Sequence, residues 1–254
     1  MYDSLIIGSG ISGLSLAHKL IKKHKNHKIA IVSKSSFQHT CSFYAQDGIA
    51  ASLHQDDIHR HICDTIKAGN YENDLQTVST IINNSAQAIY FLQHIGVRFD
   101  NDTALEAGHT SHRIFHCSDL TGEHIMNQLY IHLPLNIEII EDTVTSLSVY
   151  NNECNGLYTQ HDYLASKNTI ICSGGAEGLF SHSINPKSNN GDGIVMASAV
   201  GAAIQNVQQI QYHPIGFYSN IYDKHLLISE SVLCAGGKIC DHAGIPIVDP
   251  LLSH

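Results

Sequence analysis

Basic residues are scarce in this sequence. The 254 residues include 14 Lys and Arg against 23 Asp and Glu, which gives a formal charge of −9 at pH 7. A protein that binds nucleic acid needs clustered cations to neutralise phosphates. We therefore expect no nucleic-acid partner.

Long apolar runs and a targeting segment are also missing. No run approaches the roughly 20 apolar residues of a membrane span, and the start Met1-Tyr2-Asp3 is neither basic nor followed by a signal-like region. These absences predict a soluble, cytoplasmic protein without a membrane partner.

The sequence has no paired cysteine motif. Its seven cysteines are odd in number and scattered, with no C-x-x-C, so neither a disulfide framework nor a zinc ribbon is indicated. We expect reduced thiols in packing positions.

Histidine is abundant, at 19 residues, and His109, His112 and His116 superficially resemble metal ligands in their spacing. They lie in a polar segment without a clean helical face, so we expect no metal.

The first thirteen residues carry the strongest signal. Leu5 to Ile7 read as a buried strand that runs into Gly8-Ser-Gly10-Ile-Ser-Gly13, and apolar residues then recur at helical spacing. A second apolar strand covers residues 28–33, as in a βαβ unit that binds a dinucleotide phosphate at the helix N-terminus. The usual ribose-binding acid is replaced by Ser33 and Lys34, which disfavours NAD and leaves FAD open.

The remaining pattern predicts an α/β fold, an FAD-binding Rossmann-like domain with a parallel central sheet. A small antiparallel element around residues 144–159 and the start of an α+β capping domain complete it. The expected helices cover residues 56–69, 74–95 (with Gly96 as C-cap), 122–133 and 194–200. The expected strands cover residues 137–140, 144–150, 154–159 and 169–172, with a short extended piece at 97–99 and a polar loop at 106–116.

Nine short segments then occur along the chain: Gly8–Gly13, Ser42–Ala51, Glu106–Arg113, Asp119–Gly122, Ser173–Ala176, Asn185–Pro186, Gly191–Gly193, Gln211–Pro214 and Ser229–Glu230. Together, and in this order, they resemble the succinate dehydrogenase, fumarate reductase and L-aspartate oxidase flavoproteins. The Ser33-Lys34 pair and the loop at 43–46 are most similar to the aspartate oxidases. Cys41 stands where many relatives carry a flavin-linking His, so the resemblance implies non-covalent FAD.

The resemblance also implies the site residues. Glu106 would face the substrate amino group, and His213 and Ser229 would hold a substrate carboxylate. The residues implied to bind FAD are Gly8, Ser9, Gly10, Gly13, Ser33, Lys34, Ser42, Gln46, Gly48, Gly174 and Asp192.

The implied reaction is oxidation of L-aspartate to iminoaspartate, with a hydride passing from Cα to flavin N5. It is the first step of de novo NAD biosynthesis, with oxygen or fumarate as the electron acceptor and functional coupling to quinolinate synthase.

Two departures from the family pattern stand out. Asp47 replaces the first Gly of a Gly-Gly pair, and its carboxylate is expected near the flavin, where it would repel an anionic reduced form. An Arg-Gly-Glu-Gly stretch is replaced by residues 233–236.

The chain also ends at His254, before the catalytic Arg and a second substrate-binding His of the family. We therefore expect an incomplete FAD-binding domain at 1–205 and the beginning of a substrate-capping domain at 206–254, in a fragment or truncated gene. Three alternatives remain at this point: a soluble fumarate reductase or succinate dehydrogenase flavoprotein subunit, a non-catalytic flavin-binding fragment, and a Rossmann NAD enzyme.

Overall fold

A computed structural model of the chain describes residues 1–213, 215–219, 224–229, 231–234 and 236–247. The chain divides into two units, each built from two stretches of sequence. Unit 1 comprises the described residues within 1–45 and 125–226, and unit 2 comprises those within 46–124 and from 227 onward. The predicted boundary between residues 205 and 206 remains a prediction.

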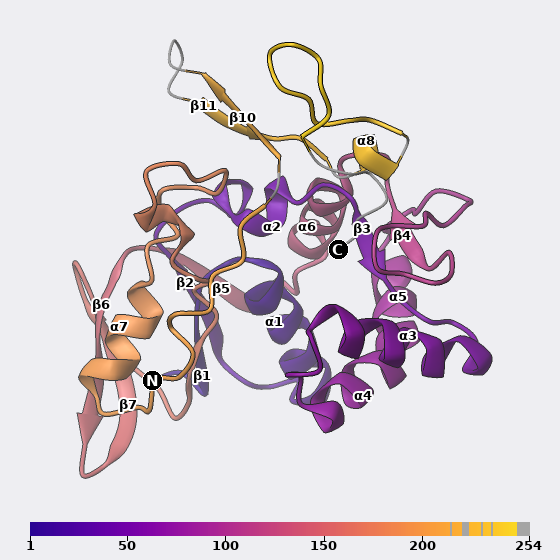
Figure 1. Ribbon diagram of the computed structural model, residues 1–254. Helices are drawn as coiled ribbons and strands as arrows, with labels where there is room; N and C mark the ends of the chain where they lie inside the picture. Colours follow the sequence, from indigo (N-terminus) through magenta and orange to yellow (C-terminus); the bar gives the residue numbers. More distant parts are fainter. Residues whose placement is uncertain (214, 220–223, 230, 235, 248–254) are drawn as a thin grey trace. The chain divides into compact units, whose positions relative to one another are not determined.

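Unit 1 is built around a four-stranded sheet in the order β5-β2-β1-β9 (Figure 1). β1 (Ser4–Ile7) pairs in parallel with β2 (Ile29–Ser33) and β9 (Thr169–Ile171), and β2 pairs in parallel with β5 (Ile137–Glu141). Every residue of β1 and β2 is buried. A parallel sheet covered on both faces requires such apolar runs, and the predicted parallel central sheet is confirmed.

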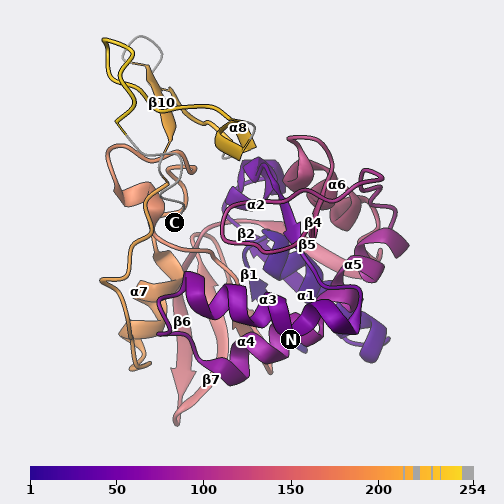
Figure 2. The same cartoon turned by 45° about the vertical axis from the view of Figure 1, so that its right-hand side comes forward.

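Helices and a second sheet complete unit 1. The antiparallel sheet of β6 (Val144–Tyr150), β7 (Glu153–Thr159) and β8 (Tyr163–Ala165) confirms the predicted antiparallel element. Val144, Leu157 and Met196 from these elements share one core cluster with residues of β1 and β2. α7 (Asp192–Ala199), which carries Met196, lies beside β6 in both ribbon views (Figures 1 and 2). The other elements are α1 (Ile11–Lys23), α2 (Cys41–Tyr44), α6 (Thr121–Ile131), β10 (Gly216–Ser219) and β11 (Lys224–Leu227), and the division into units falls within α6 and β11.

Unit 2 combines helices with a short antiparallel pair of strands. α3 (Gln55–Ala68) packs against α4 (Leu75–Asn83), which is followed by α5 (Ser85–His94) (Figure 2). β3 (Gly48–Ala50) pairs antiparallel with β4 (Ile114–His116), with Ile49 opposite Phe115. The last element is α8 (Ser231–Cys234).

The predicted single helix at 74–95 is wrong, because the helix breaks at Asn84. Asn84 ends α4 and begins the turn into α5. The Ser85 hydroxyl donates to the Ile82 carbonyl at 2.7 Å and accepts the Ser52 N–H at 3.0 Å. Asn and Ser side chains compete for backbone hydrogen bonds in this way, which lowers their helix propensity. The predicted C-cap is confirmed, since Gly96 has φ +101° and the Val97 N–H closes onto the Leu92 carbonyl.

Further local expectations are corrected. The predicted polar loop at 106–116 contains β4, and the residues at 97–99 form no strand. Among the described cysteines all six are free thiols, and Cys63 and Cys240 are exposed rather than in packing positions. None of the helices in the described ranges is long and apolar enough to cross a membrane.

Candidate functional site

A pocket of about 660 Å³ lies within unit 1. Its wall is formed by the glycine turn after β1, the end of β2, the start of α1, the turn after β9 and the start of α7. Eight of the eleven residues predicted to bind FAD line it: Gly8, Ser9, Gly10, Ser33, Lys34, Ser42, Gly174 and Asp192. The carboxyl ends of parallel strands are where ligands bind in open α/β sheets.

The N-terminus of α1 forms part of this wall. Gly10 caps the helix without a side-chain hydrogen bond, and the first turn contains no acidic residue. The Ile11 N–H donates to the Ser42 hydroxyl at 3.1 Å, and Ser12 also lines the pocket. Such a helix start offers backbone N–H groups and the positive end of the dipole to an anion. A pyrophosphate fits this arrangement.

Two glycines allow the close packing beneath the pocket. Gly8 has φ +110°, and a Cβ built on it would lie 2.4 Å from the Cys172 carbonyl oxygen. A Cβ on Gly13 would lie 2.0 Å from the Gly8 carbonyl oxygen. No L side chain fits at either position. Glycine at these two positions therefore permits the tight turn after β1 and the close approach of α1 to that turn.

Neutral hydroxyl groups stand where NAD-binding proteins place an acid. Ser33 ends β2, its Oγ donates to the Ser35 carbonyl at 2.8 Å, and it lies 2.8 Å from the Ser9 Oγ. Because the Ser33 hydrogen is used on Ser35, Ser9 donates to Ser33. The pair leaves the end of β2 uncharged.

The ammonium group of Lys34 is held at the same end of β2. Lys34 Nζ lies 2.5 Å from Asp192 Oδ2 and 2.7 Å from Asn190 Oδ1. The two charged side chains are about one-third exposed, at 30% and 33%. An ion pair this open contributes little to stability, under about 1 kcal/mol. It does link the end of β2 to the first turn of α7, and so fixes a Lys at the pocket.

The other three residues predicted to bind FAD do not line this pocket. Gly13 packs α1 against the turn, and Gly48 lies in unit 2, where a Cβ would stand 2.5 Å from the Phe115 carbonyl oxygen in the paired strand β4. Gln46 also belongs to unit 2, and its Oε1 is buried without a hydrogen-bond partner among the described residues. Buried polar atoms are normally satisfied, so an orphaned acceptor of this kind fits a site completed by a bound group.

The residues predicted to contact substrate are distributed over both units. Glu106 begins a turn in unit 2 that the His109 N–H closes onto the Glu106 carbonyl at 3.2 Å. Ser229, also in unit 2, is 8% exposed and donates from Oγ to Asp47 Oδ1 at 2.6 Å. His213 lies in unit 1, with Nδ1 2.8 Å from the Ile215 carbonyl oxygen. The structure thus brings Ser229 together with Asp47.

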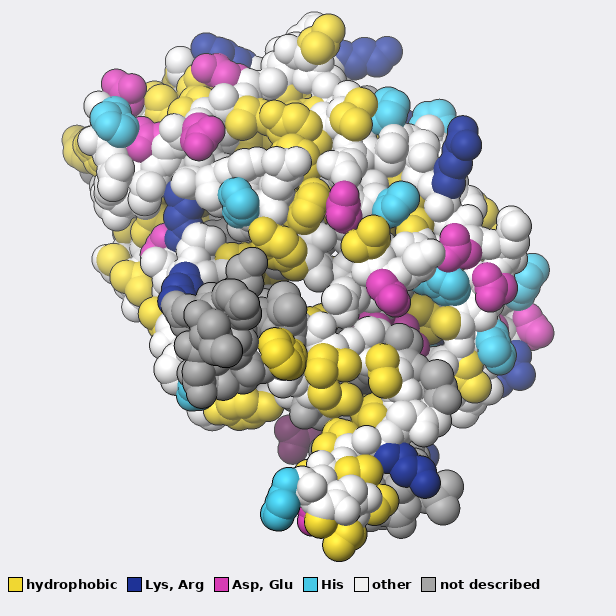
Figure 3. All heavy atoms as spheres, turned by 90° about the horizontal axis from the view of Figure 1, so that it is seen from above, with side chains coloured by type: hydrophobic (Ala, Val, Ile, Leu, Met, Phe, Trp, Pro, Cys, Tyr) yellow, Lys and Arg dark blue, Asp and Glu magenta, His cyan; other side chains and the backbone are white. Residues whose placement is uncertain are grey.

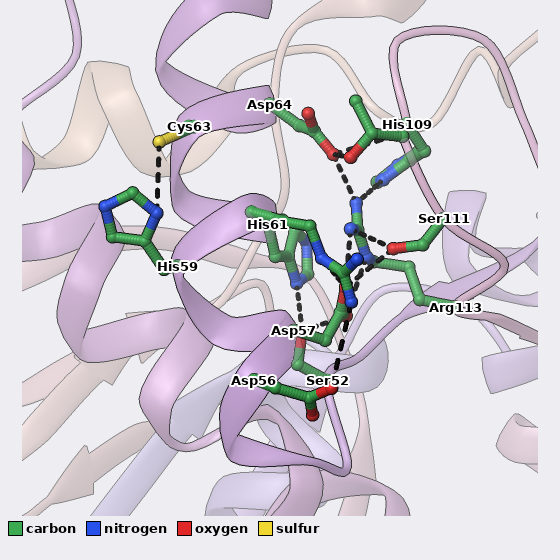
Figure 4. Close-up of polar contacts among 12 residues, drawn as sticks. Ser52, Asp56, Asp57, His59, His61, Cys63, Asp64, His109, Ser111 and Arg113 are labelled. Atoms are coloured by element: carbon green, nitrogen blue, oxygen red, sulfur yellow. Dashed lines mark hydrogen bonds and ion pairs between the residues drawn. The ribbon is translucent and has the colours of Figure 1, made fainter.

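Unit 2 contains a buried charge cluster around Arg113 that was not predicted from the sequence (Figure 4). Arg113, 2% exposed, binds Asp57 in bidentate fashion, from Nε at 2.9 Å and from Nη2 at 2.8 Å. Its Nη1 donates to Asp64 at 2.6 Å and to His109 Nδ1 at 2.9 Å. Arg113 also contacts the hydroxyl of Ser111 at 2.5 Å. The guanidinium therefore ties α3 to the polar segment that follows Glu106.

Hydrogen bonding determines the protonation states in this cluster. Arginine only donates, so His109 Nδ1 must accept from Arg113 and His109 is neutral. The Ser52 hydroxyl donates to Asp57 at 2.7 Å and so accepts from His61 Nδ1 at 3.0 Å. Burial and then the nearby Arg113 charge lower the pKa of His61 from 6.5 to about 4, and the same causes lower the pKa of His109.

The two aspartates are held as carboxylates. Hydrogen bonds from Arg113, partly opposed by burial, hold the pKa of Asp57 well below its usual range. Burial raises the pKa of Asp64, but hydrogen bonds from Arg113 and Thr110 outweigh it and leave a lowered pKa. Asp57, His61 and Asp64 are spaced i, i+4, i+7, which is one face of a helix. Polar residues at that spacing were the available sequence signal.

The three histidines with ligand-like spacing have separate partners. His109 accepts from Arg113, His112 Nδ1 lies 2.9 Å from the Thr103 carbonyl oxygen, and His116 Nδ1 lies 3.0 Å from Asp100. In the described ranges no group of three His, Cys, Asp or Glu is arranged to hold a metal ion.

On the face drawn in Figure 3, the His, Lys and Arg side chains of the described residues are dispersed rather than gathered into one patch.

Comparison with known proteins agrees with this geometry. The FAD binding domain family matches residues 3–251. The L-aspartate oxidase of Clostridium acetobutylicum is 37% identical over 98% of this chain and 60% of its own length. For the L-aspartate oxidase of Clostridium perfringens the identity is 35%, over 98% of this chain and 59% of that protein. The chain thus spans about 60% of the length of these relatives.

A solved structure of E. coli quinol fumarate reductase superimposes with a TM-score of 0.88 at 22% identity, over 96% of this chain and 44% of that chain. At this identity the likeness shows the fold alone. The NAD-enzyme alternative is overturned by the family match. The chain therefore belongs to the FAD binding domain family, and its cofactor is FAD.

Proposed function

We propose that this chain is the FAD-binding part of an FAD-dependent oxidoreductase that oxidises L-aspartate to iminoaspartate. The observation that carries the proposal is the pocket of unit 1, where the start of α1, Ser33 and Lys34 converge. The eight lining residues named above would hold FAD without a covalent bond, with the pyrophosphate at the start of α1. The similarity to the clostridial L-aspartate oxidases supports aspartate as the substrate.

The proposed chemistry is a two-electron oxidation of the Cα–N bond. FAD, when bound, supplies the acceptor, N5, for the hydride that leaves Cα. One proton leaves the ammonium group, and the product is iminoaspartate in its protonated, iminium form. Oxygen or fumarate would take the electrons afterwards. The reaction would be the first step of de novo NAD biosynthesis, coupled to quinolinate synthase.

The residues of this chain would bind and orient the substrate. Glu106 would pair with the substrate ammonium, a contact that succinate and fumarate cannot make. Ser229 and His213 would donate to a substrate carboxylate. Holding Cα in line with its acceptor is one contribution that such groups make to the rate. In this proposal residues 1–205 form the FAD-binding domain and residues 206–254 begin the capping domain.

The test is anaerobic reduction of the FAD-loaded 254-residue chain, followed by flavin absorbance. L-aspartate is expected to bleach the flavin, and succinate is not. Glu106→Gln keeps the size of the side chain and removes its charge, so it should slow reduction by aspartate. A flavin that succinate reduces and aspartate does not would favour a succinate dehydrogenase or fumarate reductase flavoprotein. A flavin indifferent to both acids would contradict the proposed oxidation in this chain.

A further inference from the structure

Asp47 has an unusual backbone conformation. Its φ is +45°, in the left-handed region that favours glycine and is tolerated by Asp and Asn. Its carbonyl oxygen accepts a hydrogen bond from the Thr121 hydroxyl, which itself accepts the Cys117 N–H at 3.0 Å. Gly48, the next residue, begins β3 against β4. The backbone on both sides of Asp47 is therefore fixed within unit 2.

The side chain of Asp47 accepts a hydrogen bond from the hydroxyl of Ser229. Ser229 Oγ donates to Asp47 Oδ1 at 2.6 Å, and Ser229 is 8% exposed. A serine hydroxyl carries one hydrogen. While that hydrogen is on Asp47, Ser229 cannot donate it to a second carboxylate. Charge-assisted bonds of this length are among the stronger hydrogen bonds in proteins.

We propose that Asp47 is a specificity-determining residue that acts as an internal carboxylate at Ser229 and weakens the binding of dicarboxylates. This rests on the proposed function, in which Ser229 binds a carboxylate of L-aspartate, and that carboxylate has to displace Asp47 from the hydroxyl. Two effects act together. The donor is already occupied, and a second carboxylate brought to the same hydroxyl meets the negative charge of Asp47. Like charges placed together in this way discriminate between ligands.

The cost falls on every dicarboxylate, the proposed substrate L-aspartate included, and it is absent where an uncharged polar group replaces the second carboxylate. Malonate and its monoamide malonamate form a matched pair of probes, because they differ in one charge and hardly in size. Neither has the two adjacent sp³ carbons whose dehydrogenation would reduce the flavin. Equilibrium binding of malonate and malonamate can therefore be measured without turnover.

The experiment is calorimetric titration of the FAD-loaded chain with each probe. Wild type is expected to bind malonamate more tightly than malonate. Asp47→Asn keeps an acceptor for Ser229 and removes the charge, and Asp47→Gly removes both. Each variant should bind malonate at least about tenfold more tightly than wild type. In Asp47→Gly, adding Ser229→Ala should abolish the gain.

Asn151→Gly is the matched control. Asn151 has φ +51° in the turn between β6 and β7 of unit 1, so this substitution makes the same backbone change in a left-handed position without touching Ser229. It should leave malonate binding unchanged. The proposal is overturned if wild type, Asp47→Asn and Asp47→Gly bind malonate equally or not at all, or if Asn151→Gly gains as much as they do.

The proposed function and this inference fail separately. If aspartate reduces the flavin but the Asp47 variants gain no malonate affinity, the inference is wrong and the oxidation stands. If those variants gain affinity but aspartate leaves the flavin oxidised, the oxidation is wrong and the role of Asp47 stands.

Discussion

Protonation of His61 is expected to destabilise unit 2 as the pH falls below 6.5. The imidazole is 5% exposed, donates from Nδ1 to Ser52, and lies in the cluster around Arg113. Burial, and then the positive charge of Arg113, lower the pKa of His61 from 6.5 to about 4. A second positive charge in this cluster is therefore unfavourable.

The size of the effect follows from the pKa difference. Between pH 6.5 and about pH 4 the unfolded chain binds a proton at His61 that the folded chain does not. Stability consequently rises with pH in this window and is lost as the pH falls through it. At 1.36 kcal/mol for each pKa unit, the full difference is about 3 kcal/mol. Well above pH 6.5 both states are neutral at this residue, and His61 contributes no slope.

Urea unfolding of wild type and His61→Gln across this pH range tests the prediction. Gln retains a donor for Ser52 and does not titrate, so the variant should lose about 3 kcal/mol less than wild type on going from pH 6.5 to pH 4. His59→Gln, on the exposed side of the same helix, is the matched control and should follow wild type. Parallel curves for wild type and His61→Gln would refute a neutral, buried His61.

Three further predictions concern packing and charge. Gly13→Ala places a Cβ 2.0 Å from the Gly8 carbonyl oxygen, so it should lower stability by about 1–3 kcal/mol or more, and an unchanged melting temperature would contradict the packing described. Arg113→Leu leaves the carboxylates of Asp57 and Asp64 uncompensated, with side chains 14% and 8% exposed. It should cost about 3–5 kcal/mol in the free energy of unfolding, and a loss below about 1 kcal/mol would show that the cluster is not buried. Lys34→Ala should change stability by under about 1 kcal/mol but weaken FAD binding about tenfold or more, a loss of at least 1.4 kcal/mol. An unchanged FAD affinity in a titration would show that Lys34 does not contribute to FAD binding.

The sheet and the glycine turn could be predicted from the sequence because each depends on a local pattern. Buried parallel strands are apolar on both faces, as in β1 and β2, and a turn that needs φ +110° at Gly8 excludes other residues. The resemblance then supplied eight of the residues that line the pocket, including Ser33 and Lys34, which no periodicity would single out.

What could not be predicted depends on contacts between distant residues. The break at Asn84 is determined by how Ser85 divides its hydrogen bonds between Ile82 and Ser52. The charge cluster joins α3 to Arg113, which is 49 residues beyond Asp64. The bond from Ser229 to Asp47 spans 182 residues. Sequence spacing shows such residue types but not that they meet.

The claim that the pocket of unit 1 binds FAD is tested most directly by reconstitution. The purified chain and the Gly13→Ala variant are each mixed with FAD, and their absorption spectra are recorded before and after acid precipitation. We predict one FAD per chain, released entirely into the acid supernatant, and loss of that flavin in the variant. A chain that takes up no FAD, keeps it in the precipitate as a covalent adduct, or binds it equally well as Gly13→Ala would contradict the account.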